Sequence, residues 1–98
     1  MNGQTIGNTV DAAITAGSGF LKGIIVHTDG TNTVTLDVYD NATEASGIKL
    51  FSTLTIPTSA TNRATVISFD YEAKYENGIY VNITCAGSVT YDVYFEPK

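Results

Sequence analysis

The sequence predicts an all-β fold, an antiparallel two-sheet β-sandwich that occupies residues 1–98 as a single domain. Three observations support this prediction. Apolar and polar residues alternate along most segments, and a period of two is typical of strands buried on one side. Turn signals recur about every eight to twelve residues, the rhythm of a sandwich. No segment has the period of about 3.6 residues that marks an amphipathic helix.

The first half of the chain offers four strands. Residues 5–16 form a weak one, marked by Val10 and Ile14, and a glycine-rich turn ends it. Residues 20–28 are the most apolar stretch, which predicts a central strand. Asp29-Gly30 is a hairpin signal, and residues 33–39 alternate strictly. A polar loop separates them from residues 48–56, where Ile48, Leu50, Leu54 and Ile56 share one parity until Pro57 stops the strand.

The second half adds three strands, which gives seven or eight in all. Residues 63–71 place Thr65, Ile67, Phe69 and Tyr71 on one parity, and residues 72–76 fit one helical turn or a loop. Residues 79–85 and 89–96 follow, each after a turn containing glycine. A jelly-roll-like connectivity is preferred to an immunoglobulin-like one, because the chain has one cysteine and no tryptophan.

One six-residue segment, the repeated phrase, occurs twice in the sequence. Val34-Thr35-Leu36-Asp37-Val38-Tyr39 returns as Val89-Thr90-Tyr91-Asp92-Val93-Tyr94 with one change. Alternation places the valines in the core and the threonine, aspartate and tyrosine outside. Tyrosine offers a large contact area at low entropic cost, so exposed strand tyrosines suit an interface, although they are also ordinary half-exposed strand residues. The predicted partner-interface residues are Thr35, Asp37, Tyr39, Tyr80, Thr90, Asp92 and Tyr94.

Size and charge limit the kinds of partner that the chain is expected to bind. The net charge is −5 and the few cations are scattered, which argues against nucleic acid and against anionic membranes as partners. A chain of 98 residues is only modestly stable alone, and one cysteine excludes an internal disulfide, so oligomerisation is the expected supplement. No signal peptide is visible, which predicts synthesis in a cytoplasm.

The sequence predicts no catalytic, cofactor or metal site. His27 with Asp29 could act as a general base, but a strand-end histidine beside a turn aspartate is favoured. Cys85 shares the parity of core residues. Asp37, Asp40, Asn41 and Glu44 could offer oxygens to calcium, yet their spacing is not that of an EF-hand, so a solvated acidic loop is favoured. Sugar binding by the outer tyrosines is a further alternative.

The order of several segments resembles small virion structural proteins of tailed bacteriophages. These segments are residues 19–26, 33–41, 45–50, 75–81 and 89–95, and the resemblance extends from about Ser18 to Glu96. It implies a non-enzymatic β-sandwich, first of all a capsid decoration or cement protein. Such a protein binds the major capsid protein or other virion proteins on the outer surface of the head, commonly as a homo-trimer, after synthesis in the host cytoplasm. A tail or fibre component is the next choice, and a carbohydrate-binding module for host recognition is the third.

Overall fold

The chain folds into eight strands. The structure is a computed structural model that describes residues 3–57, 61 and 63–98, with only the backbone of 69–72. The described residues contain no helix, and therefore none long and apolar enough to cross a membrane. The strands are β1 (Gly3–Asn8), β2 (Ala12–Ala16), β3 (Gly19–Thr28), β4 (Val34–Tyr39), β5 (Leu54–Ile56), β6 (Ala64–Tyr75), β7 (Gly78–Cys85) and β8 (Val89–Pro97).

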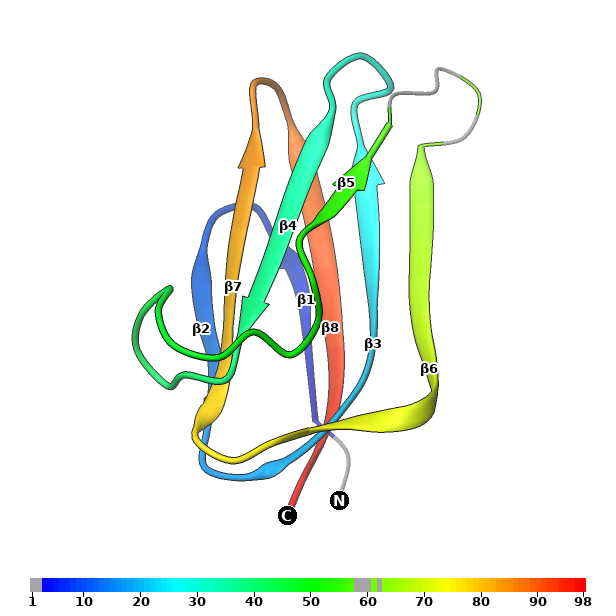
Figure 1. The fold of residues 1–98 in the computed structure, drawn as a ribbon. Helices are drawn as coiled ribbons and strands as arrows, with labels where there is room; N and C mark the ends of the chain where they lie inside the picture. Colours follow the sequence, from blue (N-terminus) through cyan, green and yellow to red (C-terminus); the bar gives the residue numbers. More distant parts are fainter. Residues whose placement is uncertain (1–2, 58–60, 62) are drawn as a thin grey trace.

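These strands form two antiparallel sheets of four strands each, packed face to face (Figure 1). Sheet A has the order β1-β8-β3-β6, and sheet B has the order β2-β7-β4-β5. The first strand pairs with the last, the second with the seventh, the third with the sixth and the fourth with the fifth. A long hairpin rolled up on itself gives this pairing, which is the jelly roll. The predicted fold class is confirmed.

The core lies between the sheets and is built by alternate residues of the strands. In β4 and β8 the burial alternates residue by residue, as the repeated phrase predicts. This pattern is expected of a strand in the middle of a sheet that has one face packed against the core and the other exposed to solvent. The buried apolar residues are Leu21, Ile24, Val26, Val34, Leu36, Val38, Ile56, Tyr75, Ile79, Val81, Val89, Tyr91, Val93 and Phe95.

The prediction of one strand over residues 5–16 is wrong, because the chain changes sheets there. β1 belongs to sheet A and β2 to sheet B, and residues 9–11 cross between them. Val10, expected as an apolar mark of the strand, is 68% exposed. Its carbonyl oxygen accepts a hydrogen bond of 2.7 Å from the hydroxyl of Tyr91. A core tyrosine of sheet A therefore holds the crossing point.

Residues 48–56 are also not one strand. Only Leu54–Ile56 form β5, and an isolated bridge joins Lys49 to Tyr39 at the end of β4. Leu50 and Phe51 pack against the core, whereas Ile48 is 76% exposed. The apolar parity predicted from Ile48 to Ile56 is broken because the backbone of residues 50–53 is irregular.

Residues 72–76 form neither a helical turn nor a loop up to Tyr75. β6 continues through Tyr75, whose ring is buried, and pairs there with Gly19 of β3. Pairing with β3 and burial of one aromatic ring outweigh the weak helical propensity of the sequence. The predicted parity of Phe69 and Tyr71 concerns side chains outside those that the structure describes.

Candidate functional site: the outer faces of the two sheets

The two copies of the repeated phrase begin side by side. The turn before β4 and the turn before β8 meet at one end of the sandwich (Figure 1). Asp29 joins them, because its carboxylate accepts hydrogen bonds from the backbone of Thr31 and Asn32 in its own turn and of Ser88 in the other, at 2.8, 2.8 and 3.2 Å. These bonds, above all those from Asn32, lower the pKa of Asp29 to about 2.

From this junction the copies run into different sheets. β4 lies inside sheet B, between β7 and β5, and β8 lies inside sheet A, between β1 and β3. Their outward side chains therefore point to opposite sides of the molecule. The seven predicted interface residues do not form one surface. Sheet B carries Thr35, Asp37, Tyr39 and Tyr80, and sheet A carries Thr90, Asp92 and Tyr94.

On the outer face of sheet B, a lysine from the loop before β5 contacts the β4 row. The Lys49 ammonium lies 3.0 Å from the Asp37 carboxylate and 5.8 Å from the centre of the Tyr39 ring. The Thr53 hydroxyl donates to the same carboxylate. The Thr53 hydrogen bond, and then Lys49, lower the pKa of Asp37. A cation over an aromatic ring is a favourable contact, so this row is already occupied by the chain's own side chains.

A second acid completes the face of sheet B. Asn82 lies opposite Asp37 in the strand register. Asp11 accepts a hydrogen bond of 2.7 Å from the backbone N–H of Ile83, and the Asn82 amide, oriented to donate, lies 2.8 Å from it. Tyr80 lies opposite Tyr39. The outer polar groups of this sheet are therefore satisfied largely within the molecule.

On the outer face of sheet A, two groups of charged side chains border an apolar patch. Asp92 accepts a hydrogen bond of 2.9 Å from the Gly7 backbone and lies 3.5 Å from the His27 imidazole. In the second group, the Lys22 ammonium lies 3.7 Å from Glu96. Each of these basic side chains has an acid beside it. An apolar patch lies between these two groups.

The centre of this face is apolar. Ile25 of β3 lies between Asp92 of β8 and Val66 of β6, and the next outward position of β3 is Gly23, opposite Tyr94. A side chain is missing at Gly23, and a shallow apolar hollow of about 240 Å³ forms there beside Ile25, Val66 and Tyr94. Val66 is 67% exposed, and Ile6 on the other edge strand is 65% exposed. Exposed apolar side chains grouped on one face mark interaction sites.

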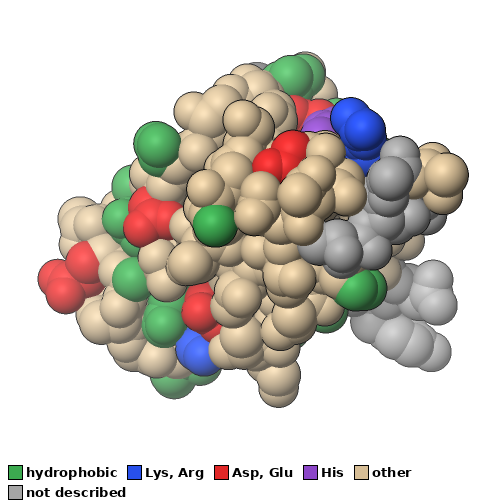
Figure 2. All heavy atoms as spheres, turned by 90° about the horizontal axis from the view of Figure 1, so that it is seen from above, with side chains coloured by type: hydrophobic (Ala, Val, Ile, Leu, Met, Phe, Trp, Pro, Cys, Tyr) green, Lys and Arg blue, Asp and Glu red, His purple; other side chains and the backbone are tan. Residues whose placement is uncertain are grey.

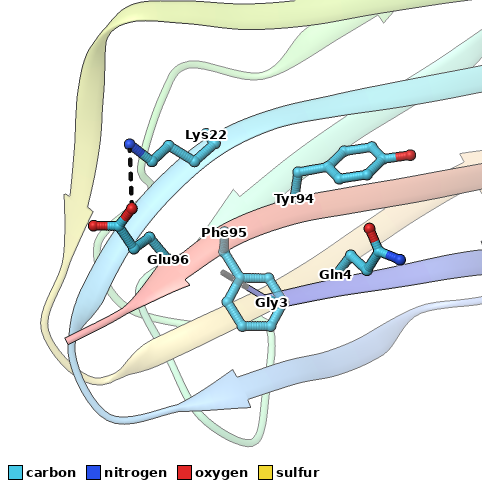
Figure 3. Close-up of a pocket in the computed structure, with 6 residues that line it drawn as sticks. All are labelled: Gly3, Gln4, Lys22, Tyr94, Phe95 and Glu96. Carbon is cyan, nitrogen blue, oxygen red and sulfur yellow. Dashed lines mark ion pairs between the residues drawn. The ribbon is translucent and has the colours of Figure 1, made fainter. Parts of the chain in front are cut away.

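Tyr94 also borders a second, more polar hollow of about 370 Å³ (Figure 3). Gln4 lies near the Tyr94 ring, whereas the Lys22–Glu96 ion pair lies at the other end of the hollow, on the side away from the tyrosine hydroxyl (Figure 3). The backbone of Gly3 comes close to the Phe95 ring, because a Cβ at Gly3 would lie 2.5 Å from it. The hollow is thus lined by a tyrosine, an amide and an ion pair.

The residues considered for catalysis or calcium are engaged elsewhere. His27 lies beside Asp92, whereas Asp29 bridges the two turns. Asp40 accepts hydrogen bonds from the backbone of the β6–β7 turn, and Asn41 caps its own loop. Within the described residues, no group of three or more His, Cys, Asp or Glu side chains is placed to hold a metal ion. Figure 2 looks down on one end of the sandwich, where acidic side chains are spread out rather than gathered.

Comparison with known proteins finds no matching family model and no significant match to a curated protein or a solved structure. The site must therefore be interpreted from its own geometry.

Sequence reasoning missed the apolar part of sheet A. Ile6, Gly23, Ile25 and Val66 were not among the predicted interface residues. One signal was present: residues 24–26 are all apolar, so that both parities of β3 are apolar at this point. A strand with one dry face needs only every second residue to be apolar. The additional one, Ile25, lies on the outer face.

Proposed function

We propose that this chain is a non-enzymatic structural protein of a phage virion that binds other virion proteins. The observation that supports this best is the outer face of sheet A, with an apolar patch bordered by charged groups. Protein interfaces combine an apolar core with a polar rim, and tyrosine is enriched in them. Because the jelly roll hosts many functions, it is this face, and not the fold, that supports the role.

The more specific role is capsid decoration. The resemblance to small virion proteins supports this role. The outer face of sheet B is acidic and its polar groups are bonded within the molecule, which suits a surface exposed to solvent. In this arrangement sheet A would face the virion proteins, the major capsid protein first. A place in the tail or a fibre is the alternative, and the trimer that the resemblance implies stays a prediction.

Quantitative mass spectrometry of purified particles tests the proposal. A decoration protein should be present at a copy number comparable to that of the capsid subunits. Immunogold labelling of intact particles then separates head from tail. Particles that lack the chain altogether would overturn the proposal.

Carbohydrate binding is the second candidate, because of the hollow beside Tyr94. In such a hollow an aromatic ring can stack on a sugar while the amide and charged groups that line it hydrogen-bond the sugar hydroxyls. A glycan array tests this with Tyr94→Ala as the decisive variant. Tyr39→Ala and Tyr80→Ala are the matched variants on the other sheet. Binding that is lost only with Tyr94→Ala would favour a sugar site on sheet A, and a blank array would exclude it.

A further inference from the structure

We infer that Asn77 is a site of spontaneous conversion to aspartate, and that the Asp40 carboxylate suppresses this conversion while the chain is folded. Asn77 precedes Gly78 in the turn between β6 and β7 and is exposed to solvent. Asparagine followed by glycine converts more readily than other asparagine dipeptides, because glycine has no side chain to hinder ring closure. The inference goes beyond the proposed function and does not depend on it.

The conversion consumes only water. The backbone nitrogen of Gly78 gives up its proton and attacks the side-chain carbonyl carbon of Asn77. The bond from that carbon to the side-chain nitrogen breaks, and ammonia leaves with the proton. Water then opens the succinimide ring at either carbonyl, which gives aspartate or isoaspartate and one new negative charge. Ring closure requires that the peptide group between the two residues be free to turn its nitrogen towards the Asn77 side chain.

This peptide group is bonded on both sides. Its N–H, which belongs to Gly78, donates to the Asp40 carboxylate at 3.3 Å. Its carbonyl oxygen, which belongs to Asn77, accepts a hydrogen bond of 3.0 Å from the backbone N–H of Gly17. Hydrogen bonds to a carboxylate are stronger than bonds between neutral groups. Turning the peptide group would break both bonds.

The same carboxylate holds the rest of the turn. Asp40 also accepts hydrogen bonds from the backbone N–H of Glu76, at 3.0 and 3.1 Å, and from that of Asn77, at 2.7 Å. Three consecutive N–H groups therefore share one acceptor, which follows directly after β4. The turn before β7, the turn before β3 and the end of β4 meet at one end of the sandwich (Figure 1). Loss of the carboxylate would release all three N–H groups at once.

Gly78 also has little room to move. It is buried, and a Cβ at this position would lie 2.5 Å from the carbonyl oxygen of Thr15 and 2.9 Å from the Cα of Ala42. The backbone of two other segments thus packs directly against the glycine. The exposure of Asn77 alone would predict rapid conversion, whereas the packing of its neighbour predicts protection. Ring closure must therefore await a local opening of this end of the molecule.

The conversion, once complete, should hinder the turn from closing again. The new carboxylate would belong to the turn that Asp40 holds, and like charges at short range repel each other. Isoaspartate would in addition lengthen the backbone directly before the buried Gly78. A single opening event can thus leave a permanent change, so the rate of conversion records how often this end of the molecule opens.

Peptide mapping by mass spectrometry, after incubation of the full chain at neutral pH, tests the inference. We expect Asn77 to convert about tenfold or more slowly in the folded chain than in the same chain unfolded in urea. Asp40→Asn should raise the rate in the folded chain about tenfold, the effect of losing one hydrogen bond to a charged group. Asp11→Asn is the matched control and should leave the rate at Asn77 unchanged. Asp11 also accepts a backbone hydrogen bond from β7, at Ile83, and both variants remove one negative charge.

The other Asn-Gly dipeptide, Asn2-Gly3, appears in the same peptide maps and reports any difference in incubation conditions, because neither variant changes its sequence. Equal rates at Asn77 in the folded and the unfolded chain would overturn the inference. So would an Asp40→Asn rate equal to that of the wild type, or a lower one, which would mean that the carboxylate acts as a base on the Gly78 nitrogen.

An acceleration by Asp11→Asn as large as that by Asp40→Asn would also overturn the inference, since global stability would then set the rate. Circular dichroism checks that each variant is folded. If Asp40→Asn is not, hydrogen exchange of the Gly78 amide in the wild type takes its place. Exchange of this amide as fast as in an unstructured chain would show that the peptide group is not held, and slow exchange would support the inference.

Discussion

The outer faces of the two sheets carry the same three side chains from the same phrase, yet their surroundings differ. On sheet B, Asp37 and Tyr39 are covered by Lys49 and Thr53 from a neighbouring loop. On sheet A no loop among the described residues is shown to contact the outward side chains of β8 in this way, and the half-buried Tyr94 borders the hollow at Gly23. A strand supplies its outer residues, but the segments packed beside it decide whether they remain available to a partner.

The difference arises from the connections of the jelly roll. The long segment between β4 and β5 folds back over the end of β4, where Leu50 donates to Val38 and Asp40 to Ile48. β8 has its neighbours β1 and β3 joined to it by direct pairing instead. On the β3 side, the residues opposite Asp92 and Tyr94 are the aliphatic Ile25 and the small Gly23. The outward residues of both copies are half-buried, but those of β4 contact a loop and those of β8 lie beside neighbouring strands.

The largest effects on stability should come from the inward-facing residues of the repeated phrase, where the two copies ought to be equivalent. Val38 and Val93 occupy matching positions of the phrase, and both are fully buried. Val38→Ala and Val93→Ala should each lower the free energy of unfolding by about 2–3 kcal/mol, through lost burial and the cavity left behind. Urea denaturation measures both. Costs that differ more than twofold would show that the copies differ inside as well as outside.

The junction from which both copies start should give acid-sensitive stability. The unfolded carboxyl of Asp29 titrates near 3.8, whereas its folded pKa is lowered to about 2. A carboxyl group whose pKa is lower in the folded than in the unfolded state stabilises the fold. This stabilisation is complete above the unfolded-state pKa and is lost as the pH falls through the folded-state pKa. The thermal unfolding midpoint of the wild type should therefore decrease as the pH is lowered from about 4 to about 2.

Asp29→Asn is the variant for this test. It should be less stable than the wild type at pH 7 and should lose less stability on acidification, because the carboxylate that holds Thr31, Asn32 and Ser88 is absent. Glu44→Gln, in an exposed loop, is the control. Parallel pH profiles for the wild type and Asp29→Asn would show that the junction does not depend on this charge.

The strands of the core could be predicted from the sequence, and the surroundings of the outer faces could not. β3, β4, β7 and β8 alternate strongly because one side of each is dry, and this local pattern is visible in the chain. The crossing at residues 9–11 and the irregular loop after β4 carry no comparable period. Which sheet receives each copy depends on pairing between distant segments, and so do the partners of Asp37 and Asp92.

Two buried tyrosines of sheet A extend the comparison to its inner face. The Tyr91 hydroxyl donates to Val10 at 2.7 Å, whereas the Tyr75 hydroxyl has no hydrogen-bond partner among the described residues. Burial raises the pKa of both. Tyr91→Phe should lower the free energy of unfolding by about 1 kcal/mol, since it leaves the carbonyl of Val10 without its partner.

Tyr75→Phe removes a hydroxyl that is buried without compensation, so it should be neutral or stabilise the protein by up to about 1 kcal/mol. Urea denaturation of the two variants side by side measures the difference. A loss of stability with Tyr75→Phe as large as that with Tyr91→Phe would mean that the Tyr75 hydroxyl has a partner after all.

The smallest effect concerns the lysine that closes the face of sheet B. Lys49 is partly exposed, and exposed ion pairs contribute little, so Lys49→Met should lower the free energy of unfolding by about 0.5 kcal/mol or less. The pKa of Asp37 should rise, yet stay below its ordinary value, because the Thr53 hydroxyl is the larger cause of its lowering. Titration of the Asp37 carboxyl by nuclear magnetic resonance measures this change. His27→Gln, beside the matching Asp92, is the control and should leave the Asp37 titration unchanged. If Lys49→Met also leaves the pKa of Asp37 unchanged, the lysine does not act on the carboxylate. The lowering of that pKa would then depend on the Thr53 hydroxyl alone.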